Sequence, residues 1–311
     1  MERTTVGLRA VDAPSPGGRA VRRWGRRLAA AAGLLALCAL PVGAADATDA
    51  GYGRGHAAAP LYVSDYGNNR VVVLPTGDGD QTTVPFEGLV RPTGMAWDVA
   101  GRLYVSDTGN NRVVVMAEDG SGQSDVPTEG LSRPLGLAVD GDGDVFVADS
   151  FNDRIVKVDA AGGQSTVPTT GLLHPWGLAL DVAGNLYVSD FVNDRVVRVA
   201  ADGSGQSTVP TVGLSQPTGL ALNSAGDLYI ADSGNNRVVK VAAVGGRQTT
   251  VHTEGLSDPL GLALDGCGSL YIADGFHNRV VRVRETGGGQ STVPTTGLNT
   301  PTGLAFPPTR R

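Results

Sequence analysis

Short apolar runs alternate with turns rich in Gly, Asp and Asn over most of the chain. In one stretch the runs are LGLAVD (135–140), DVFVAD (144–149), RIVKV (154–158) and QSTVPT (164–169). Each run has the length of a β-strand, and the connections between them are too short to hold helices. The pattern therefore predicts an all-β fold built from antiparallel four-stranded sheets.

The same pattern recurs along the chain with a nearly constant period. An Asp that ends the second strand is followed by an Arg that begins the third, and successive copies lie 41 or 42 residues apart. A period of about 40 to 45 residues with four strands is typical of β-propeller blades. A catalytic group is needed only once, so we expect the six pairs to be structural, with Asp accepting turn N–H groups and Arg pairing with it or bridging to the next blade. The pairs are Asp65 and Arg70, Asp107 and Arg112, Asp149 and Arg154, Asp190 and Arg195, Asp232 and Arg237, and Asp274 and Arg279.

The composition of each strand indicates its place in a blade. The second and third strands are apolar on both faces, as expected for a sheet packed between two others, and the first is built on Gly, Leu and Ala, which fit the crowded axis. Because proline lacks the N–H that a central strand needs, the fourth strand should be the outer edge. Its prolines are Pro85, Pro127, Pro168, Pro210 and Pro294, with His252 in the remaining copy.

The two ends of the pattern complement each other. The first copy begins at its second strand, LYVSD (61–65), and the pattern ends on a first strand, PTGLAF (301–306). We therefore expect a six-bladed β-propeller of four-stranded antiparallel blades, with the ring closed by the C-terminal strand completing the first blade. The expected organisation is a signal peptide at 1–45, a flexible Gly/Ala-rich linker at 46–60, the propeller at 61–306 and a C-terminal tail at 307–311.

The N-terminal segment has the order of a secretory signal. The basic stretch RAVRRWGRR precedes the apolar run LAAAAGLLALCALPVGA, which is short for a membrane span, and small residues offer cleavage after Ala44 or Ala45. An exported, secreted or extracytoplasmic protein is expected. Alternatives are an uncleaved anchor, a lipid on Cys38 and twin-arginine export through Arg26 and Arg27; membrane association is expected only through such a leader.

The charge distribution argues against nucleic acid as a partner. The chain carries 25 Lys and Arg against 31 Asp and Glu, a net charge of −6. Residues 1–45 contribute seven Arg and two acidic residues, or +5, so the remainder carries −6 − 5 = −11. Such a surface repels phosphate backbones, and nucleic acid is not an expected partner.

Three motifs carry a resemblance to a known family. Pro-x-Gly-Leu-Ala-x-Asp, Gly-x-Leu-Tyr-Val-x-Asp and Asn-x-Arg-Val-Val recur in order, and together they resemble the NHL repeat. The stretch HPWGLALDVAGNLYVSDFVNDRVVRV (174–199) is similar to the extracellular sensor propeller of bacterial receptor Ser/Thr kinases of the PknD type, although this chain has no kinase domain. The resemblance implies extracellular binding by a sensor-like module.

Binding residues are expected where the six copies differ, because repeats carry packing and their variable loops carry recognition. The residue before Pro-x-Gly, the residue after its proline and the turn between the second and third strands share one rim of a propeller. Exposed aromatic side chains beside arginines are typical of recognition surfaces; the alternative is that these rings pack locally over the turns. The candidates are Tyr66, Arg91, Arg133, Phe151, His174, Trp176, Phe191, Gln216, Asp258 and Phe276.

Motifs for catalysis or metal binding are sparse. The four histidines are His56, His174, His252 and His277, which fall in different parts of the repeat, so a three-histidine zinc site is not expected. DGDGD (140–144) alternates carboxylates as a calcium loop does, but Val145 and Phe151 stand where that loop needs Gly and Glu, so we interpret it as a turn. No cofactor is expected.

These observations predict a monomeric, non-catalytic binding or sensor module for a protein, peptide or cell-wall ligand. Two alternatives remain: a propeller lyase or hydrolase with its site at the channel mouth, and a purely structural repeat protein.

Overall fold

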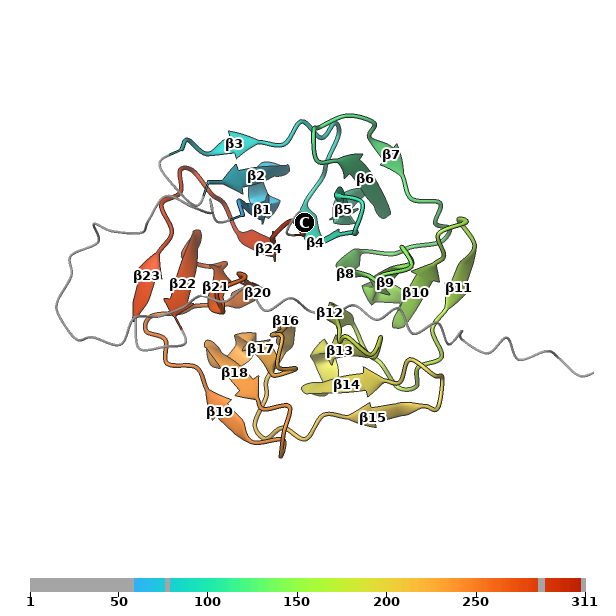
Figure 1. The fold of residues 1–311 in the computed structure, drawn as a ribbon, viewed down its shortest axis with the longest axis vertical. Coiled ribbons are helices and arrows are strands. Elements are labelled where there is room, and N and C mark those ends of the chain that lie inside the picture. Colours follow the sequence, from blue (N-terminus) through green and yellow to red (C-terminus); the bar gives the residue numbers. More distant parts are fainter. Residues whose placement is uncertain (1–58, 76–78, 285–288, 309–311) are drawn as a thin grey trace, which may run out of the picture. The chain divides into compact units, whose positions relative to one another are not determined.

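The computed structural model describes residues 59–75, 79–284 and 289–308. Six four-stranded antiparallel sheets are arranged as blades around a central axis (Figure 1). This confirms the predicted six-bladed propeller. The predicted signal peptide and nearly all of the predicted linker lie outside the described residues. Within the described ranges, no helix combines the length and the apolar character needed to cross a membrane.

The strands of each blade are given in order from the innermost to the outermost. Blade 1 has the order β24–β1–β2–β3, and blades 2 to 6 follow as β4–β7, β8–β11, β12–β15, β16–β19 and β20–β23. The innermost strands are β4 (Pro92–Trp97), β8 (Pro134–Val139), β12 (Pro175–Leu180), β16 (Pro217–Leu222), β20 (Pro259–Leu264) and β24 (Pro301–Ala305). The second strands are β1 (Leu61–Asp65), β5 (Arg102–Asp107), β9 (Val145–Asp149), β13 (Leu186–Asp190), β17 (Leu228–Asp232) and β21 (Ser269–Asp274).

The third and fourth strands complete the blades. The third strands are β2 (Arg70–Leu74), β6 (Arg112–Ala117), β10 (Arg154–Val158), β14 (Arg195–Val199), β18 (Arg237–Val241) and β22 (Arg279–Arg284). The outer strands are β3 (Thr82–Thr83), β7 (Ser124–Asp125), β11 (Gln164–Thr166), β15 (Gln206–Thr208), β19 (Gln248–Thr250) and β23 (Gln290–Thr292). Between the second and third strands lie the 3-10 turns η1 (Tyr66–Asn68), η2 (Thr108–Asn110), η3 (Ser150–Asn152), η4 (Phe191–Asn193) and η5 (Ser233–Asn235), whereas blade 6 has a plain turn.

The ring closes through the two ends of the propeller, as predicted. Strand β24 pairs antiparallel with β1, with Tyr62 opposite Ala305. Two contacts reinforce this pairing: the Asn299 N–H donates to Asp65 Oδ1 at 2.7 Å, and the Gly67 N–H donates to the Asn299 carbonyl at 2.8 Å.

Neighbouring blades share the hydrophobic core. In β9 all five residues are buried, because one face packs on the preceding blade and the other on the next. One cluster joins Tyr104 and Val113 of blade 2 to Leu137, Val147 and Val156 of blade 3. Full burial of such a side chain contributes roughly 1.5–3 kcal/mol, so packing between blades makes a large contribution to stability.

Glycine at Pro-x-Gly brings the inner strands close together. A Cβ on Gly94 would overlap the Leu135 carbonyl of the next blade, and the same contact recurs at each blade around the axis. The pairs are Gly94 and Leu135, Gly136 and Trp176, Gly177 and Thr218, Gly219 and Leu260, Gly261 and Thr302, and Gly303 and Thr93. Glycine is needed here because main chain meets main chain, with no flexible side chain that could move aside.

The outer strand is the edge of each blade, as predicted, but it is shorter than the sequence suggested. Strand β11 ends at Thr166, after which the Val167 N–H still donates to the Ile155 carbonyl at 2.9 Å. Pro168 follows and has no N–H to continue the ladder. The prolines therefore lie just beyond the outer strands instead of within them.

Candidate functional site

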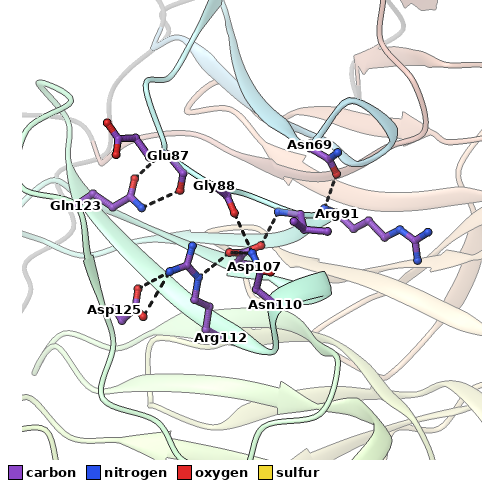
Figure 2. A network of polar contacts seen from close by, with 10 residues as sticks. Asn69, Glu87, Gly88, Arg91, Asp107, Asn110, Arg112, Gln123 and Asp125 are labelled. Carbon is purple, nitrogen blue, oxygen red and sulfur yellow. Dashed lines mark hydrogen bonds and ion pairs between the residues drawn. The ribbon is translucent and has the colours of Figure 1, made fainter.

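The repeated Asp–Arg pair ties each hairpin to the loop that enters its blade. Figure 2 shows the second copy, in which the fully buried Asp107 is the acceptor. Its Oδ1 accepts the Val90 N–H at 2.7 Å, and its Oδ2 accepts Asn110 Nδ2 at 2.8 Å and Arg112 Nε at 2.7 Å. Asn110 also donates to the Gly88 carbonyl at 2.9 Å. These contacts hold the main chain of the incoming loop at Val90 and Gly88 and fix the side chains of Asn110 and Arg112 on Asp107, which is the arrangement of a scaffold.

Blades 1, 3, 4 and 5 repeat these contacts, whereas in blade 6 His277 replaces the asparagine and contacts Asp274 at 3.0 Å. The partner of the outer guanidinium nitrogen varies. In blades 1, 3, 4, 5 and 6 this nitrogen donates to a loop carbonyl, as Arg154 does to Gly130 at 3.2 Å. Arg112 instead forms an ion pair with Asp125 of its own blade at 3.1 Å. The arginines therefore contact the loop entering their own blade or their own outer strand.

The residue before Pro-x-Gly has the same backbone conformation in all six copies. Its φ lies between 49° and 55°, in the left-handed region, and none of the six residues is glycine. In each copy its N–H donates to the side-chain oxygen of an Asn or Asp. That Asn or Asp is the last residue of the turn between the second and third strands of the preceding blade. The loop residues with their acceptors are Arg91 with Asn69, Arg133 with Asn111, His174 with Asp153, Gln216 with Asp194, Asp258 with Asn236, and Thr300 with Asn278. The scaffold thus fixes the backbone and leaves the side chain free to vary.

Five of the predicted site residues lie on the rim of blades 3 and 4, where they form two groups of contacts. The Arg133 guanidinium lies 4.7 Å from the centre of the Phe151 ring, and His174 stacks on Phe151 at 5.0 Å with planes 19° apart. Trp176 packs against Phe191 at 5.2 Å. We call these five residues the aromatic cluster.

The aromatic cluster is partly open to solvent. Phe151 is 50% exposed, and two neighbouring apolar side chains that the sequence analysis did not select, Leu173 and Val192, are 42% and 49% exposed. The Val192 N–H donates to the Leu173 carbonyl, so these two residues lie side by side. Their signal in the sequence was an apolar residue at two positions where most of the other copies have Ser, Asn or Gly.

The other predicted site residues lie elsewhere on the rim. Arg91 lies 5.9 Å from the centre of the Tyr66 ring, between blades 1 and 2. Phe276 is 74% exposed in blade 6 and meets His277 edge-on at 5.9 Å. Gln216 and Asp258 belong to blades 5 and 6, and desolvation with the nearby Asp274 carboxylate raises the pKa of Asp258. The structure therefore divides the ten candidates among several sectors of the rim.

Trp176 and Phe191 occupy a position that is polar in two other blades. In blade 5 the corresponding Thr218 and Ser233 are buried, their hydroxyls lie 2.7 Å apart, and Thr218 donates to the Pro259 carbonyl of the next blade at 3.0 Å. Blade 2 has an equivalent pair of threonines. These variable threonines are scaffold residues, whereas blade 4 replaces the hydrogen-bonded pair with two aromatic rings.

An axial cavity opens beside the inner strands. Its lining consists of Thr, Gly, Leu and Met residues of these strands together with Trp176. Among the described lining residues there is no ionisable side chain. The cavity offers an apolar surface and main-chain groups, without an acid or a base for proton transfer.

The described part of the chain has no group of three His, Cys, Asp or Glu side chains that could hold a metal ion. In DGDGD, Asp140 Oδ1 accepts the N–H groups of Asp142 at 3.0 Å and Asp144 at 2.9 Å, which is the geometry of a turn. Burial raises the pKa of Asp140. Cys267 is exposed at the corresponding turn of blade 6.

A set of glutamines links the outer strands, and the sequence analysis did not select it. Gln123 of blade 2 accepts the Glu87 N–H at 2.7 Å and donates to the Glu87 carbonyl at 3.1 Å (Figure 2). The equivalent contact between Gln81 and Thr296 joins blade 1 to blade 6. The 42-residue period marked these glutamines, but only the folded ring reveals their partners.

Comparison with known proteins supports the repeat assignment. The NHL repeat profile matches residues 89–116, 131–158 and 214–241, each running from near the start of an inner strand to the third strand of blades 2, 3 and 5. The chain thus contains NHL repeats. No curated protein sequence is detectably similar to it.

Solved structures share the propeller fold at low sequence identity. A chain of the nidogen/laminin complex is 24% identical with a TM-score of 0.71, covering 79% of this chain and 97% of that chain. The virginiamycin B lyase from Staphylococcus aureus is 16% identical with a TM-score of 0.61, covering 81% and 89%. A streptogramin B lyase is 20% identical with a TM-score of 0.56, covering 66% and 70%. These similarities extend to the fold alone, and they include both a binding complex and enzymes.

Proposed function

We propose that this NHL-repeat propeller is a non-catalytic binding module that holds a protein, peptide or cell-envelope ligand on the aromatic cluster. The observation that carries the proposal is the exchange at Trp176 and Phe191. Blades 2 and 5 use this position for buried hydroxyl pairs that join neighbouring blades, and blade 4 gives up those hydrogen bonds for aromatic rings. Large aromatic side chains beside an arginine are the residue types that dominate binding hot spots.

Recognition accounts for the cluster better than catalysis does. General acid–base catalysis needs an ionisable group within hydrogen-bond reach of the reacting atoms. The described lining of the axial cavity supplies none, and His174 is stacked on Phe151 at the rim. Metal analysis of the purified protein tests the lyase or hydrolase alternative, which stoichiometric zinc or calcium would favour.

The proposal includes a location outside the cytoplasm. The basic-then-apolar order of residues 19–45 is typical of an export signal, and the resemblance to receptor kinase sensors agrees with extracellular binding. N-terminal sequencing of the secreted protein should begin at Ala45 or Asp46. Recovery of an intact chain that requires detergent would indicate a membrane anchor instead.

The proposed binding surface is tested by replacing the aromatic pair of blade 4 with the hydroxyl pair of blade 5. In the double variant Trp176→Thr with Phe191→Ser, blade 4 receives the pair found in blade 5, so the fold should tolerate it. Capture of the ligand from the native cell envelope by the immobilised protein should fall by at least about tenfold, since each hot-spot ring contributes about 2 kcal/mol or more.

The matched control removes apolar surface from the opposite rim. Val182 and Val244 are fully or almost fully exposed in turns at the other end of the blades. The double variant Val182→Ala with Val244→Ala should bind as the wild type does. Equal capture by the blade 4 variant and the wild type would refute the proposed surface.

A further inference from the structure

The side chains at the left-handed loop positions are not distributed evenly around the ring. Blades 2, 3 and 4 carry Arg91, Arg133 and His174, whereas the other three blades carry Gln, Asp and Thr. Basic groups are therefore concentrated on one half of a rim whose backbone geometry is the same throughout. The scaffold does not require this distribution.

Arg91 and Arg133 are the basic loop residues whose backbone N–H is accepted by an uncharged side-chain amide of the preceding blade's hairpin turn. Their N–H groups donate to Asn69 and Asn111, at 2.8 and 2.7 Å. For the loop residues of blades 4 and 5, His174 and Gln216, the same role is played by a carboxylate, Asp153 of blade 3 and Asp194 of blade 4, so a carboxylate also fits this position. Asparagine thus performs the structural role without placing a negative charge beside either arginine.

Neither guanidinium is neutralised within the described part of the chain. Both arginines are exposed, and their only side-chain partners there are the rings of Tyr66 and Phe151. In Figure 2 the Arg91 side chain extends away from the Asp107 network. By contrast, Arg112 in the same network pairs with two carboxylates. In a chain with 31 acidic and 25 basic residues, two exposed and unpaired arginines on adjacent blades are a local reversal of charge.

We infer that the ligand of this rim is an acidic–apolar peptide segment of a protein, an assignment that rests on the proposed function. Its carboxylates lie on Arg91 and Arg133, where charge-assisted hydrogen bonds are available. Its apolar side chains lie on Trp176, Phe191 and the adjacent Val192. Asp153 and Asp194 follow the apolar side chains of Phe151 and Val192 in the hairpin turns of blades 3 and 4, and their carboxylates repel acidic groups there, so the acidic part lies on Arg91 and Arg133.

A simple polyanion fits this surface less well. It would leave the exposed rings uncovered, and the overall negative charge of the chain would repel it beyond the two arginines. A peptide with separate acidic and apolar parts satisfies both halves of the surface.

The test uses three fluorescent peptides of equal length and fluorescence anisotropy with the purified protein. The first has a glutamate block followed by a leucine–tryptophan block, the second has lysine in place of glutamate, and the third has serine in place of the apolar block. The key variant is Arg91→Gln with Arg133→Gln. Gln216 already occupies the same left-handed conformation, with φ 50°, so glutamine is tolerated there. Arg247→Gln, an exposed arginine in a turn on the opposite rim, is the charge control.

The first peptide should bind most tightly, and the double glutamine variant should weaken it about tenfold and reduce its salt dependence, whereas Arg247→Gln should not. Tighter binding of the lysine peptide would overturn the acidic assignment and leave the binding surface in place. Equal binding of the serine peptide would indicate a polyanion. If no peptide binds while capture still depends on Trp176 and Phe191, the ligand class is wrong and the proposed function stands.

Discussion

Because the inner strands are in main-chain contact, adding a single methyl group to one of their glycines should destabilise the protein. In Gly219→Ala the new Cβ would overlap the Leu260 carbonyl and lie 3.0 Å from both Gly261 Cα and Leu262 N. All three are main-chain atoms of the next blade, so no side-chain rotation can relieve the overlap. The inner strands must separate at this point, and the neighbouring contacts around the axis must follow.

The expected magnitude follows from comparing two glycines. Overpacking a filled core destabilises a protein by about 1–3 kcal/mol. At Gly266, by contrast, nothing lies within 4 Å of the added Cβ and φ is not in the left-handed region, so alanine should be neutral or stabilise by up to about 1 kcal/mol. The two variants should therefore differ by about 1–4 kcal/mol. In a domain of this size that difference corresponds to roughly 2–16 °C in Tm.

Urea denaturation and thermal melting of the wild type, Gly219→Ala and Gly266→Ala measure this difference. Gly141→Ala is a second control, because its added Cβ also meets nothing within 4 Å. If Gly219→Ala and Gly266→Ala melt within about 1 °C of each other, the inner strands are not held by main-chain contact and the structural reason given for Pro-x-Gly is wrong.

Three further predictions concern the scaffold. Asp190→Ala should destabilise the protein by about 3–5 kcal/mol, because Asp190 is fully buried and its loss leaves Arg195 and a loop N–H without their acceptor; adding Arg195→Ala should cost less than the sum of the single changes, as chemical denaturation would show, and additive effects would contradict a coupled pair. Removal of residues 300–311 deletes β24 and should cost several kcal/mol by opening the ring; wild-type melting would be incompatible with closure by this strand. Burial raises the pKa of Tyr271 to about 12, above the ordinary value of about 10, so unfolding free energy should fall as the pH rises from about 10 towards 12. Tyr271→Phe should reduce this dependence, and an unchanged pH profile in that variant would assign the effect to other groups, such as Tyr62 and Tyr104, whose pKa values burial also raises.

The fold could be predicted from the sequence because each blade repeats one local pattern. Short apolar strands, Gly- and Asn-rich turns and the spacing between Asp107 and Arg112 all lie within one copy of about 42 residues. The split first blade was also visible, since it depends only on which strand begins and which ends the pattern. The outer strands were overestimated because the period marks Pro168 without showing that hydrogen bonding stops before it.

The candidate site depended on contacts between copies, which no single repeat contains. The sequence identified Phe151, His174 and Trp176 as exceptions to the pattern, and the ring brought Phe151 of one blade between two loop residues that belong to different blades. The ring also buries Thr218, although the residue type at this position differs between copies, as it does at the positions of Phe151 and His174. Such contacts depend on loop conformation and on the angle between neighbouring sheets, where a difference of a few ångströms separates an exposed ring from a buried hydroxyl pair. The repeating pattern alone therefore determined the architecture, and packing between blades decided which of its exceptions form a surface.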